Sequence, residues 1–258
     1  MDSDILASFS RSSLEESKLM SFLNRFDTKY VLKIDAALDF IKDIQNDYSL
    51  LQINDKIIQS YRTVYFDTPE LHCFNLHHNK RANRFKFRTR QYLSNGKIFN
   101  EIKQKLNTGK TVKFRQRRDI EKNGIPVLGE VSKFDDAFMN LASSNGYKFE
   151  ALAPSLFVFF NRITFLNKRF PERATLDFDL RYEFGKTEVL LKDMAIVELK
   201  RDRSPERSTA QNFLRKIHKE PSAFSKYCMG VCLTREDARK NRFLPSLKNL
   251  SFERSSLP

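Results

Sequence analysis

The sequence of 258 residues contains no tryptophan, only seven glycines and only three cysteines. So few glycines exclude a collagen-like or glycine-rich low-complexity protein. The cysteines, Cys73, Cys228 and Cys232, form no Cys-x-x-Cys pair, and their number is odd. A reduced, intracellular protein is the simplest interpretation of this cysteine usage.

Long hydrophobic runs are also missing. The longest, Leu156–Phe160, is far shorter than the ~20 residues that a membrane-spanning helix needs. The N-terminus, Met1-Asp2-Ser3-Asp4, has neither the basic nor the apolar region of a secretory signal. We therefore expect a cytoplasmic location and no membrane span in this chain.

Cations and phenylalanine are abundant. The 40% of hydrophobic residues, with 24 phenylalanines, are enough for a sizeable core and exclude global disorder. Lysine and arginine total 46 against 32 acidic residues, which gives a net charge of +14. Such a surplus predicts a polyanionic partner: nucleic acid, an anionic membrane, or a phosphorylated molecule or polymer.

Period-two alternation dominates the chain. It predicts eight strands, at residues 25–33, 60–67, 84–90, 99–105, 111–115, 156–165, 173–182 and 194–201. Tight turns at 94–96 and 107–109 join three of them into an antiparallel meander. Helical spacing predicts helices near 14–23, 34–44, 134–142 and 208–218. Because no βαβ rhythm occurs, we predict an α+β, mainly β fold.

The charged side chains occupy one of the two alternating sets of positions along these strands, which we call a parity. Side chains two residues apart share a face of a strand. One parity carries Asp27, Lys29, Arg62, Arg84, Lys86, Arg88, Arg90, Glu101, Lys103, Lys105, Lys113, Arg115, Arg117, Arg162, Arg173, Asp177, Asp179, Glu198 and Lys200. The other carries Phe85, Phe87, Ile102, Val112, Phe114, Ile163, Leu176, Phe178, Val197 and Leu199.

For any single strand, a solvated sheet face explains this alternation. Across all strands cations dominate, and rows of like charge repel one another unless an anion lies between them. A barrel with the charged parity inside and the apolar parity covered by helices explains the whole set. Such an interior is suited to a chain of phosphates and a divalent metal.

RNA binding by a basic, phenylalanine-rich sheet is the main rival. Proteins that bind single strands place cations and stacking aromatic rings on the same surface. Here Phe85, Phe87 and Phe114 have the opposite parity to the cations. We therefore expect no nucleic-acid partner.

Eight short motifs occur in the order typical of one known family. They are Arg25-Phe26-Asp27-Thr28-Lys29-Tyr30, Val64-Tyr65-Phe66-Asp67-Thr68, Arg84-x-Lys86-x-Arg88-x-Arg90-x-Tyr92, Phe99-x-Glu101-Ile102-Lys103, Phe160-Asn161-Arg162, Arg173-x-Thr175-Leu176-Asp177, Val197-Glu198-Leu199-Lys200 and Phe224-Ser225-Lys226-Tyr227. They resemble the VTC (vacuolar transporter chaperone) domain, the polyphosphate polymerase branch of the CYTH-like triphosphate tunnel metalloenzymes. The resemblance implies an eight-stranded antiparallel triphosphate-tunnel barrel with a cationic interior, covered by helices. We expect this domain at 25–232, after an N-terminal helical segment (1–24) and before a basic C-terminal tail (233–258).

The resemblance also implies roles for individual residues. Positions that bind phosphates match Lys29, Arg88, Arg90, Lys103, Lys113, Arg162, Arg173 and Lys226. Among these, Arg88, Arg90, Lys103, Arg162 and Arg173 are the candidates for binding the nucleotide. Arg62 and Lys200 join the phosphate-binding set from the charged parity. Glu198 matches the carboxylate that holds Mn²⁺ or Mg²⁺, and Glu101 is a second metal candidate.

The activity implied is transfer of the γ-phosphate of ATP onto a polyphosphate chain. Expected ligands are a nucleoside triphosphate, polyphosphate, pyrophosphate or phosphate. The hydrolytic relatives begin with Glu-x-Glu-x-Lys, whereas this chain has Arg25-x-Asp27-x-Lys29, which favours the polymerase. A triphosphatase and a non-catalytic binder of polyphosphate or RNA stay open as alternatives. Any membrane coupling would need a separate membrane-protein partner.

Overall fold

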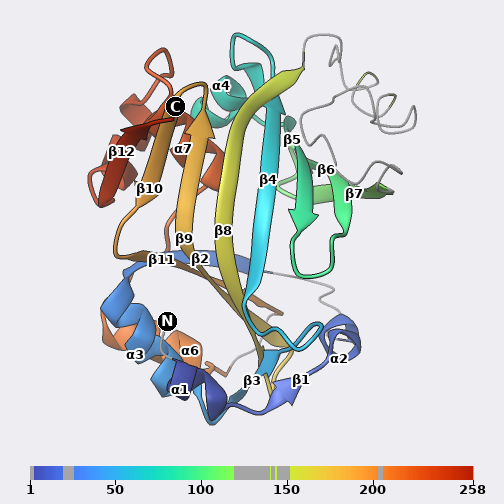
Figure 1. The fold of residues 1–258 in the computed structure, drawn as a ribbon, viewed down its shortest axis with the longest axis vertical. Coiled ribbons are helices and arrows are strands. Elements are labelled where there is room, and N and C mark those ends of the chain that lie inside the picture. The colour runs from blue at the N-terminus through green and yellow to red at the C-terminus, as the bar shows by residue number, and fades with distance from the viewer. Residues whose placement is uncertain are drawn as a thin grey trace. The chain divides into compact units, whose positions relative to one another are not determined.

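A computed structural model describes residues 3–19, 26–118, 140, 143, 152–202 and 206–257 (Figure 1). The predicted helix at 134–142 lies almost entirely outside the described residues, and so does Arg25. Among the described residues, no helix is both long enough and apolar enough to cross a membrane. The expected cytoplasmic location and membrane-protein partner stay predictions.

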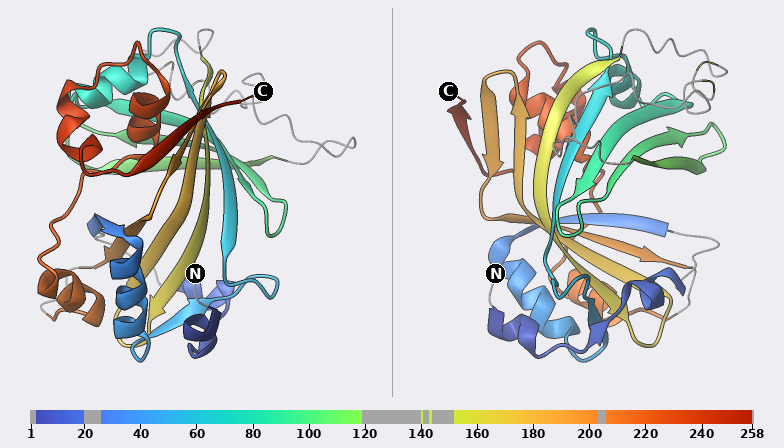
Figure 2. Two further views of the ribbon diagram at one scale, coloured as in Figure 1. Left: turned by 60° about the vertical axis from the view of Figure 1, so that its left-hand side comes forward. Right: turned by 45° about the vertical axis from the view of Figure 1, so that its right-hand side comes forward.

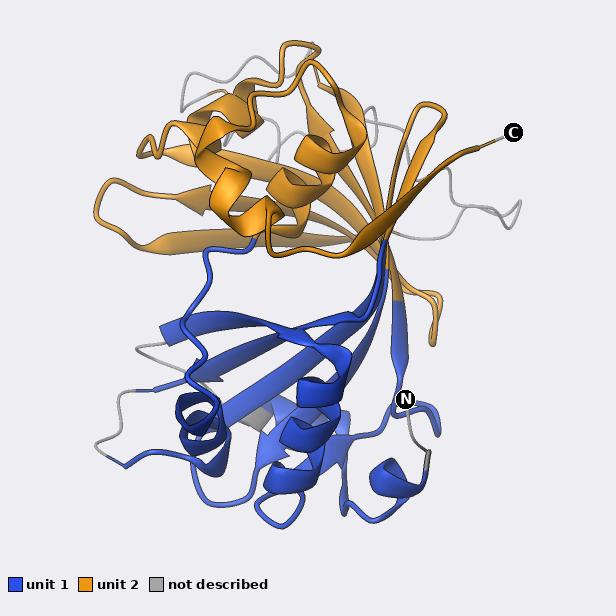
Figure 3. Ribbon diagram, turned by 90° about the vertical axis from the view of Figure 1, so that its left-hand side faces the viewer, with its two compact units in different colours: residues 1–60, 160–180, 191–224 blue, residues 61–159, 181–190, 225–258 orange. Residues whose placement is uncertain are grey.

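The chain divides into two compact units, each assembled from three separate segments (Figure 3). Unit 1 comprises 1–60, 160–180 and 191–224, and unit 2 comprises 61–159, 181–190 and 225–258. Strands β8 (Ala153–Asn167) and β9 (Glu172–Phe184) are the two longest among the described residues (Figure 2), and each has residues in both units. The domain boundaries expected at 24 and 232 stay predictions.

Unit 1 is built on an antiparallel sheet. Its strands β2 (Phe26–Lys33) and β9 flank β11 (Met194–Arg201), and Glu198 lies opposite Lys29 on one side and Thr175 on the other. The shorter β3 (Tyr48–Leu51) pairs with the end of β8 and, in parallel, with β1 (Arg11–Ser12). The helices of this unit are α1 (Ser3–Ala7), α2 (Leu14–Leu19), α3 (Ile34–Ile44) and α6 (Thr209–Lys216).

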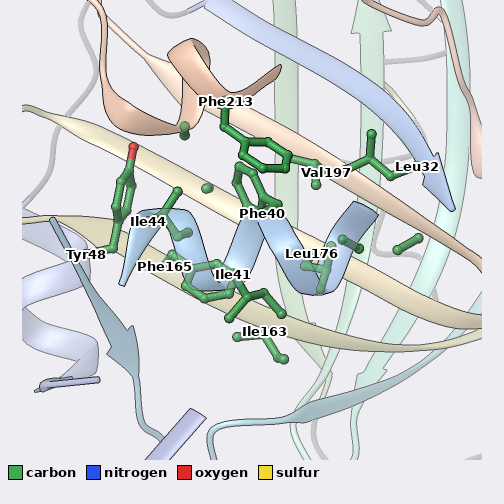
Figure 4. Close-up of a cluster of buried hydrophobic side chains, with 14 of the residues drawn as sticks. Leu32, Phe40, Ile41, Ile44, Tyr48, Ile163, Phe165, Leu176, Val197 and Phe213 are labelled. Carbon is green, nitrogen blue, oxygen red and sulfur yellow. The ribbon is translucent and has the colours of Figure 1, made fainter. Parts of the chain in front are cut away.

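Two helices cover the apolar face of this sheet. Helix α3 buries Ala37, Phe40, Ile41 and Ile44, whose spacing places them on one side of the helix. Figure 4 shows this side against strand residues such as Leu176 and Val197 and against Phe213 of α6. The rings of Phe40 and Phe213 meet edge to face, with centroids 5.7 Å apart. The apolar parity of unit 1 is therefore core.

Helix α6 has a clear N-terminal signal. The Ser208 side chain accepts a hydrogen bond from the Gln211 backbone N–H, and the Gln211 side chain accepts one from the Ser208 backbone N–H. This capping box satisfies two backbone donors that would otherwise lack partners. The predicted helix at 208–218 is confirmed, and so is the one at 34–44.

Unit 2 contains an antiparallel meander. Strand β4 (Gln59–Asp67) pairs with β5 (Arg84–Tyr92), which continues through β6 (Ile98–Lys105) to β7 (Thr111–Arg118). Both turns contain a glycine in the left-handed region, Gly96 and Gly109, as tight β-hairpin turns favour. The first part of β8, the end of β9, β10 (Thr187–Leu191) and β12 (Phe252–Ser256) complete the strands.

Helices α4 (His72–His78), α7 (Lys226–Thr234) and α8 (Leu244–Leu247) and a 3₁₀ turn (Asn241–Phe243) also belong to unit 2. Helix α7 is buried along nearly its whole length. A Cβ at Gly230 would lie only 2.5 Å from Leu156 and 2.6 Å from Tyr182, so glycine permits this close packing. The sequence pattern missed α7 because a helix buried all round has no polar face.

The predicted mainly antiparallel α+β class is confirmed. All eight predicted strands are present, as β2, β4, β5, β6, β7, β8, β9 and β11. Four short strands, β1, β3, β10 and β12, bring the described total to twelve. The strand pairings among the described residues do not form a closed ring, so closure of the barrel stays a prediction.

Candidate functional site: two charged sheet faces

The meander of unit 2 has one strongly cationic face. Because residues paired across strands share a face, the registers assign each side chain to it. This face carries nine cations, Arg84, Lys86, Arg88, Arg90, Lys103, Lys105, Lys113, Arg115 and Arg117, and two carboxylates, Asp67 and Glu101. We call it the charged face of unit 2. The opposite face buries Val64, Phe66, Phe85, Phe87 and Ile102.

Glu101 lies at the centre of the charged face of unit 2 and is fully buried. Its Oε2 is 2.5 Å from Nη2 of Arg88, and its Oε1 is 2.5 Å from Nζ of Lys113. Burial raises the pKa of Glu101, but Arg88, Arg90 and Lys113 outweigh it and hold that pKa well below its usual range. Since cations occupy both oxygens, Glu101 is better suited to anchoring Arg88 and Lys113 than to the predicted role of metal ligand.

Arg90 is buried beside this pair. It donates a hydrogen bond from Nε to the Thr63 hydroxyl at 3.0 Å and lies over the ring of Tyr61. Burial, followed by repulsion from Arg88, lowers its pKa. A guanidinium whose charge is opposed in this way gains most from an anionic ligand.

Two tyrosines connect this face to helix α7. Arg88 donates a weak hydrogen bond to the Tyr65 hydroxyl at 3.4 Å. Burial raises the pKa of Tyr65, but the positive field of Arg88 and Arg90 outweighs it and lowers that pKa. Tyr65 stacks on Tyr227 with centroids 5.0 Å apart, and the Tyr227 hydroxyl donates to Asp67.

The start of α7 therefore lies on the charged face of unit 2. Ser225 caps the helix and accepts a hydrogen bond from Nζ of Lys86 at 3.0 Å. The predicted phosphate ligand Lys226 stands between Ser225 and Tyr227, both of which contact this face. Tyr65 and Asp67 belong to a motif that carries the family resemblance, but alternation within β4 assigns neither of them a role.

The predicted placement of Arg62 with the other cations is wrong. In the register of β4 and β5, Arg62 pairs with Gln91, whereas Tyr65 pairs with Arg88. Arg62 therefore lies on the opposite face, where its guanidinium is 5.7 Å from the ring centre of Phe159. The parity of β4 relative to β5 depends on the register between them, which alternation within one strand does not determine.

Unit 1 has a second charged face, formed by β2, β11 and β9 on the side opposite to α3. Its centre is Glu198, with Oε1 3.1 Å from Nζ of Lys29 and Oε2 3.4 Å from Nζ of Lys200. Burial lowers the pKa of Lys200 to about 8, despite the opposing effect of Glu198. Arg173 is the cross-strand neighbour of Lys200. We call this the charged face of unit 1.

Arg162 joins this face through a two-pronged ion pair with Asp177. Its Nε and Nη2 donate to the two carboxylate oxygens at 2.5 and 2.7 Å. Asp177 is buried, so the pair fixes the plane of the guanidinium. Unit 1 thus gathers the predicted residues Lys29, Arg162, Arg173, Glu198 and Lys200, and unit 2 gathers Arg88, Arg90, Lys103 and Lys113.

A divalent metal can be tested against these groups. Among the described residues, no three histidine, cysteine, aspartate or glutamate side chains form a group that could hold a metal ion. Glu198 is a partly exposed carboxylate that lies between the ammonium groups of Lys29 and Lys200. Mg²⁺ commonly binds one or two carboxylates together with substrate phosphates and water. Glu198 therefore fits a metal that is held jointly with a nucleotide.

Comparisons with known proteins agree with this fold. A family model described as the VTC domain matches residues 24–235. A solved "putative adenylate cyclase" from Bacillus halodurans is similar, with a TM-score of 0.52 and 11% identity, over 78% of this chain and 94% of that one. A "putative adenylyl cyclase" from Hippeastrum, described as having a dominant triphosphatase activity, has a TM-score of 0.47 and 16% identity, over 81% and 95% of the two chains. No curated protein matches the sequence. The family resemblance inferred from the motifs is confirmed.

Proposed function

The chain belongs to the VTC domain family, and from this premise we propose that it is a polyphosphate polymerase. It moves the γ-phosphate of ATP onto the end of a polyphosphate chain. The charged face of unit 2 is the main support, since nine cations share it with two carboxylates. A row of phosphates supplies the negative charge that this face lacks.

The reaction asks the protein mainly for positioning and charge neutralisation. The bond between the γ-phosphorus and its bridging oxygen breaks, and the electron pair leaves with ADP. A terminal oxygen of the acceptor phosphate forms the new bond. That oxygen is already ionised near neutral pH, so no side chain has to remove a proton from it.

Each charged face has a part in this proposal. Arg88, Arg90 and Lys103 on unit 2, and Arg162 and Arg173 on unit 1, are the candidates for binding the nucleotide phosphates. Charge-assisted hydrogen bonds from such groups contribute roughly 1.5–3 kcal/mol each. The buried ion pairs to Glu101 and Asp177 hold Arg88 and Arg162 in place before substrate binds.

Glu198 would hold Mn²⁺ or Mg²⁺ together with the nucleotide phosphates. The cation would neutralise charge that develops on the transferred group. Lys29 and Lys200 orient the same carboxylate from two sides. With the carboxylate engaged by a metal, their ammonium groups would be available to phosphate oxygens.

Hydrolysis of triphosphate is the alternative, since triphosphatases share the tunnel fold. A hydrolase must activate water, and paired carboxylates near the metal serve that purpose. Here Asp27, the remaining member of the N-terminal motif, lies opposite Lys200 in the register. The motif therefore supplies one carboxylate where the hydrolytic relatives have two, which favours transfer to phosphate over transfer to water.

A phosphorus NMR time course of the full chain with ATP and Mn²⁺ tests the proposal. We expect loss of ATP to be matched by ADP and by a growing resonance of internal phosphates, with little free phosphate. A pyrophosphate primer should shorten any lag. Stoichiometric free phosphate without polymer would show a triphosphatase, and no turnover with intact polyphosphate binding would show a binding module.

A further inference from the structure

The charged face of unit 2 also contains an aromatic cluster. Tyr61, Tyr92 and Phe99 lie on this face, with centroids 5.0 Å apart for Tyr61 and Tyr92 and 5.6 Å apart for Tyr92 and Phe99. The sequence predicted that aromatic rings and cations lie on opposite faces. That holds for Phe85 and Phe87 but not at this end of the meander.

Arg115 is fixed on top of this cluster by three contacts. Its guanidinium lies 3.6 Å from the ring centre of Phe99. Its Nη2 donates to the Tyr92 hydroxyl at 2.8 Å, and its Nε is 3.5 Å from Oε1 of Glu101. The side chain is nevertheless 39% exposed. The guanidinium plane of Arg115 is therefore held in one orientation, while part of the side chain stays accessible to a ligand.

We propose that Arg115, supported by Phe99, is the platform on which the base of the substrate nucleotide stacks. This inference rests on the proposed function and specifies its substrate as a nucleotide, recognised through its base as well as its phosphates. Guanidinium planes stack well on the π-faces of bases. Because Tyr92 and Glu101 already engage two of its nitrogens, Arg115 is better placed to stack than to bind phosphate.

Distance along the strands supports this assignment. Residues i and i+2 of a strand lie about 7 Å apart. Lys113 and Arg88 are phosphate-binding candidates that form ion pairs with Glu101. Lys113 is two residues from Arg115 on β7, and Arg88 is two residues from Arg90 on β5, so each pair is about 7 Å apart. A nucleotide whose triphosphate lies on those cations can place its base over Arg115. The anchoring of Arg115 removes part of the ordering cost of binding.

Stacking predicts a particular selectivity. Every base has a π-face, so stacking distinguishes nucleotides from inorganic phosphates better than it distinguishes one base from another. We expect ATP and GTP to bind with similar affinity and tripolyphosphate to bind more weakly. The platform thus separates the nucleotide donor from the polyphosphate product.

The test uses titration calorimetry of the full chain with ATP and, separately, with tripolyphosphate. Arg115→Lys keeps the charge and removes the planar group, and Tyr92→Phe removes only one anchor. We expect Arg115→Lys to weaken ATP binding about 5–10-fold and Tyr92→Phe to weaken it about 2-fold. Tripolyphosphate binding should change less than 2-fold. The control is Arg169→Lys in unit 1, where Arg169 also lies over a ring, that of Phe170.

Each other result has a defined meaning. Equal losses for ATP and tripolyphosphate in Arg115→Lys would make Arg115 a phosphate ligand and overturn the platform. Unchanged binding of both ligands in Arg115→Lys would also overturn it. Failure of the unmodified protein to bind either ligand would reject the proposed function itself. Tighter binding of an oligoadenylate than of ATP, lost in Arg115→Lys, would assign the face to RNA.

Discussion

The two charged faces differ in how their charges are balanced. On unit 1, four cations, Lys29, Arg162, Arg173 and Lys200, share the face with three carboxylates, Asp27, Asp177 and Glu198. On unit 2, nine cations share the face with two carboxylates. A balanced face can present a carboxylate to a metal ion, whereas a face with excess cations needs an anionic ligand. The difference suggests separate tasks for the two units.

The central carboxylates differ in the same way. Glu101 is fully buried between two ion pairs of 2.5 Å, whereas Glu198 keeps 12% of its side chain exposed and lies 3.1 and 3.4 Å from its two lysines. Removing one partner of a buried ion pair leaves an uncompensated charge in the interior. Removing one member of a longer pair that includes a partly exposed lysine, such as Lys29, costs less. Stability should therefore depend on Glu101 and activity on Glu198.

The largest expected effect is on folding, in Glu101→Gln. This change keeps the shape and leaves Arg88 and Lys113 without their counter-charge, so we expect a loss of about 3–5 kcal/mol in the free energy of unfolding. Urea denaturation measures it, with Glu198→Gln as the matched control, which we expect to lose less because its ion pairs are longer and Lys29 is 34% exposed. Added tripolyphosphate should recover part of the loss. Equal stability of the two variants would remove the distinction between the faces.

Phe87→Ala and Lys103→Ala compare the two sides of the same sheet. Phe87 is fully buried, so its truncation should cost about 3–5 kcal/mol in stability. Lys103→Ala should leave the unfolding free energy within about 0.5 kcal/mol but weaken polyphosphate binding roughly 10-fold. Thermal melting and calorimetry measure the two quantities. If Lys103→Ala unfolds and Phe87→Ala stays stable, the buried face of the sheet is the cationic one and the assignment of the two faces is wrong.

Glu198→Gln tests the catalytic side of the comparison. The amide keeps the shape but loses the charge that would bind a divalent metal, so we expect turnover of ATP to fall about 100-fold with saturating Mn²⁺. Polyphosphate binding should persist or become tighter, because one negative charge has gone. Release of ADP and binding of tripolyphosphate are the two measurements. Full turnover in this variant would refute the role of Glu198.

The smallest effect is a pH dependence on unit 1. Because the pKa of Lys200 is about 8, this side chain is cationic at pH 7 and largely neutral at pH 9. Tripolyphosphate binding should therefore weaken about 2–3-fold from pH 7 to pH 9, beyond any change in Lys200→Arg. Arginine stays protonated throughout this range. Identical pH profiles for the two proteins would show that Lys200 does not contact phosphate.

Much of the fold and of the site follows from alternation within single strands. The period-two pattern of β5 assigns Phe85 and Phe87 to one face and Arg88 and Arg90 to the other, and the structure agrees. Burial of an apolar side chain stabilises the folded state, whereas burial of an unpaired cation destabilises it. Apolar and cationic side chains therefore occupy opposite faces of the strand. The amphipathic spacing of α3 determines its buried side for the same reason.

Contacts between residues on different strands depend on how the strands pair. Register placed Arg62 on the apolar side of β4, buried Glu101 between Arg88 and Lys113, and brought Arg115 onto Phe99. A shift of one residue between two strands moves every side chain of one strand to the other face. Alternation within a strand contains no information about that shift. The sequence therefore determined which residues share a strand face, and the pairing of strands determined which of those residues meet.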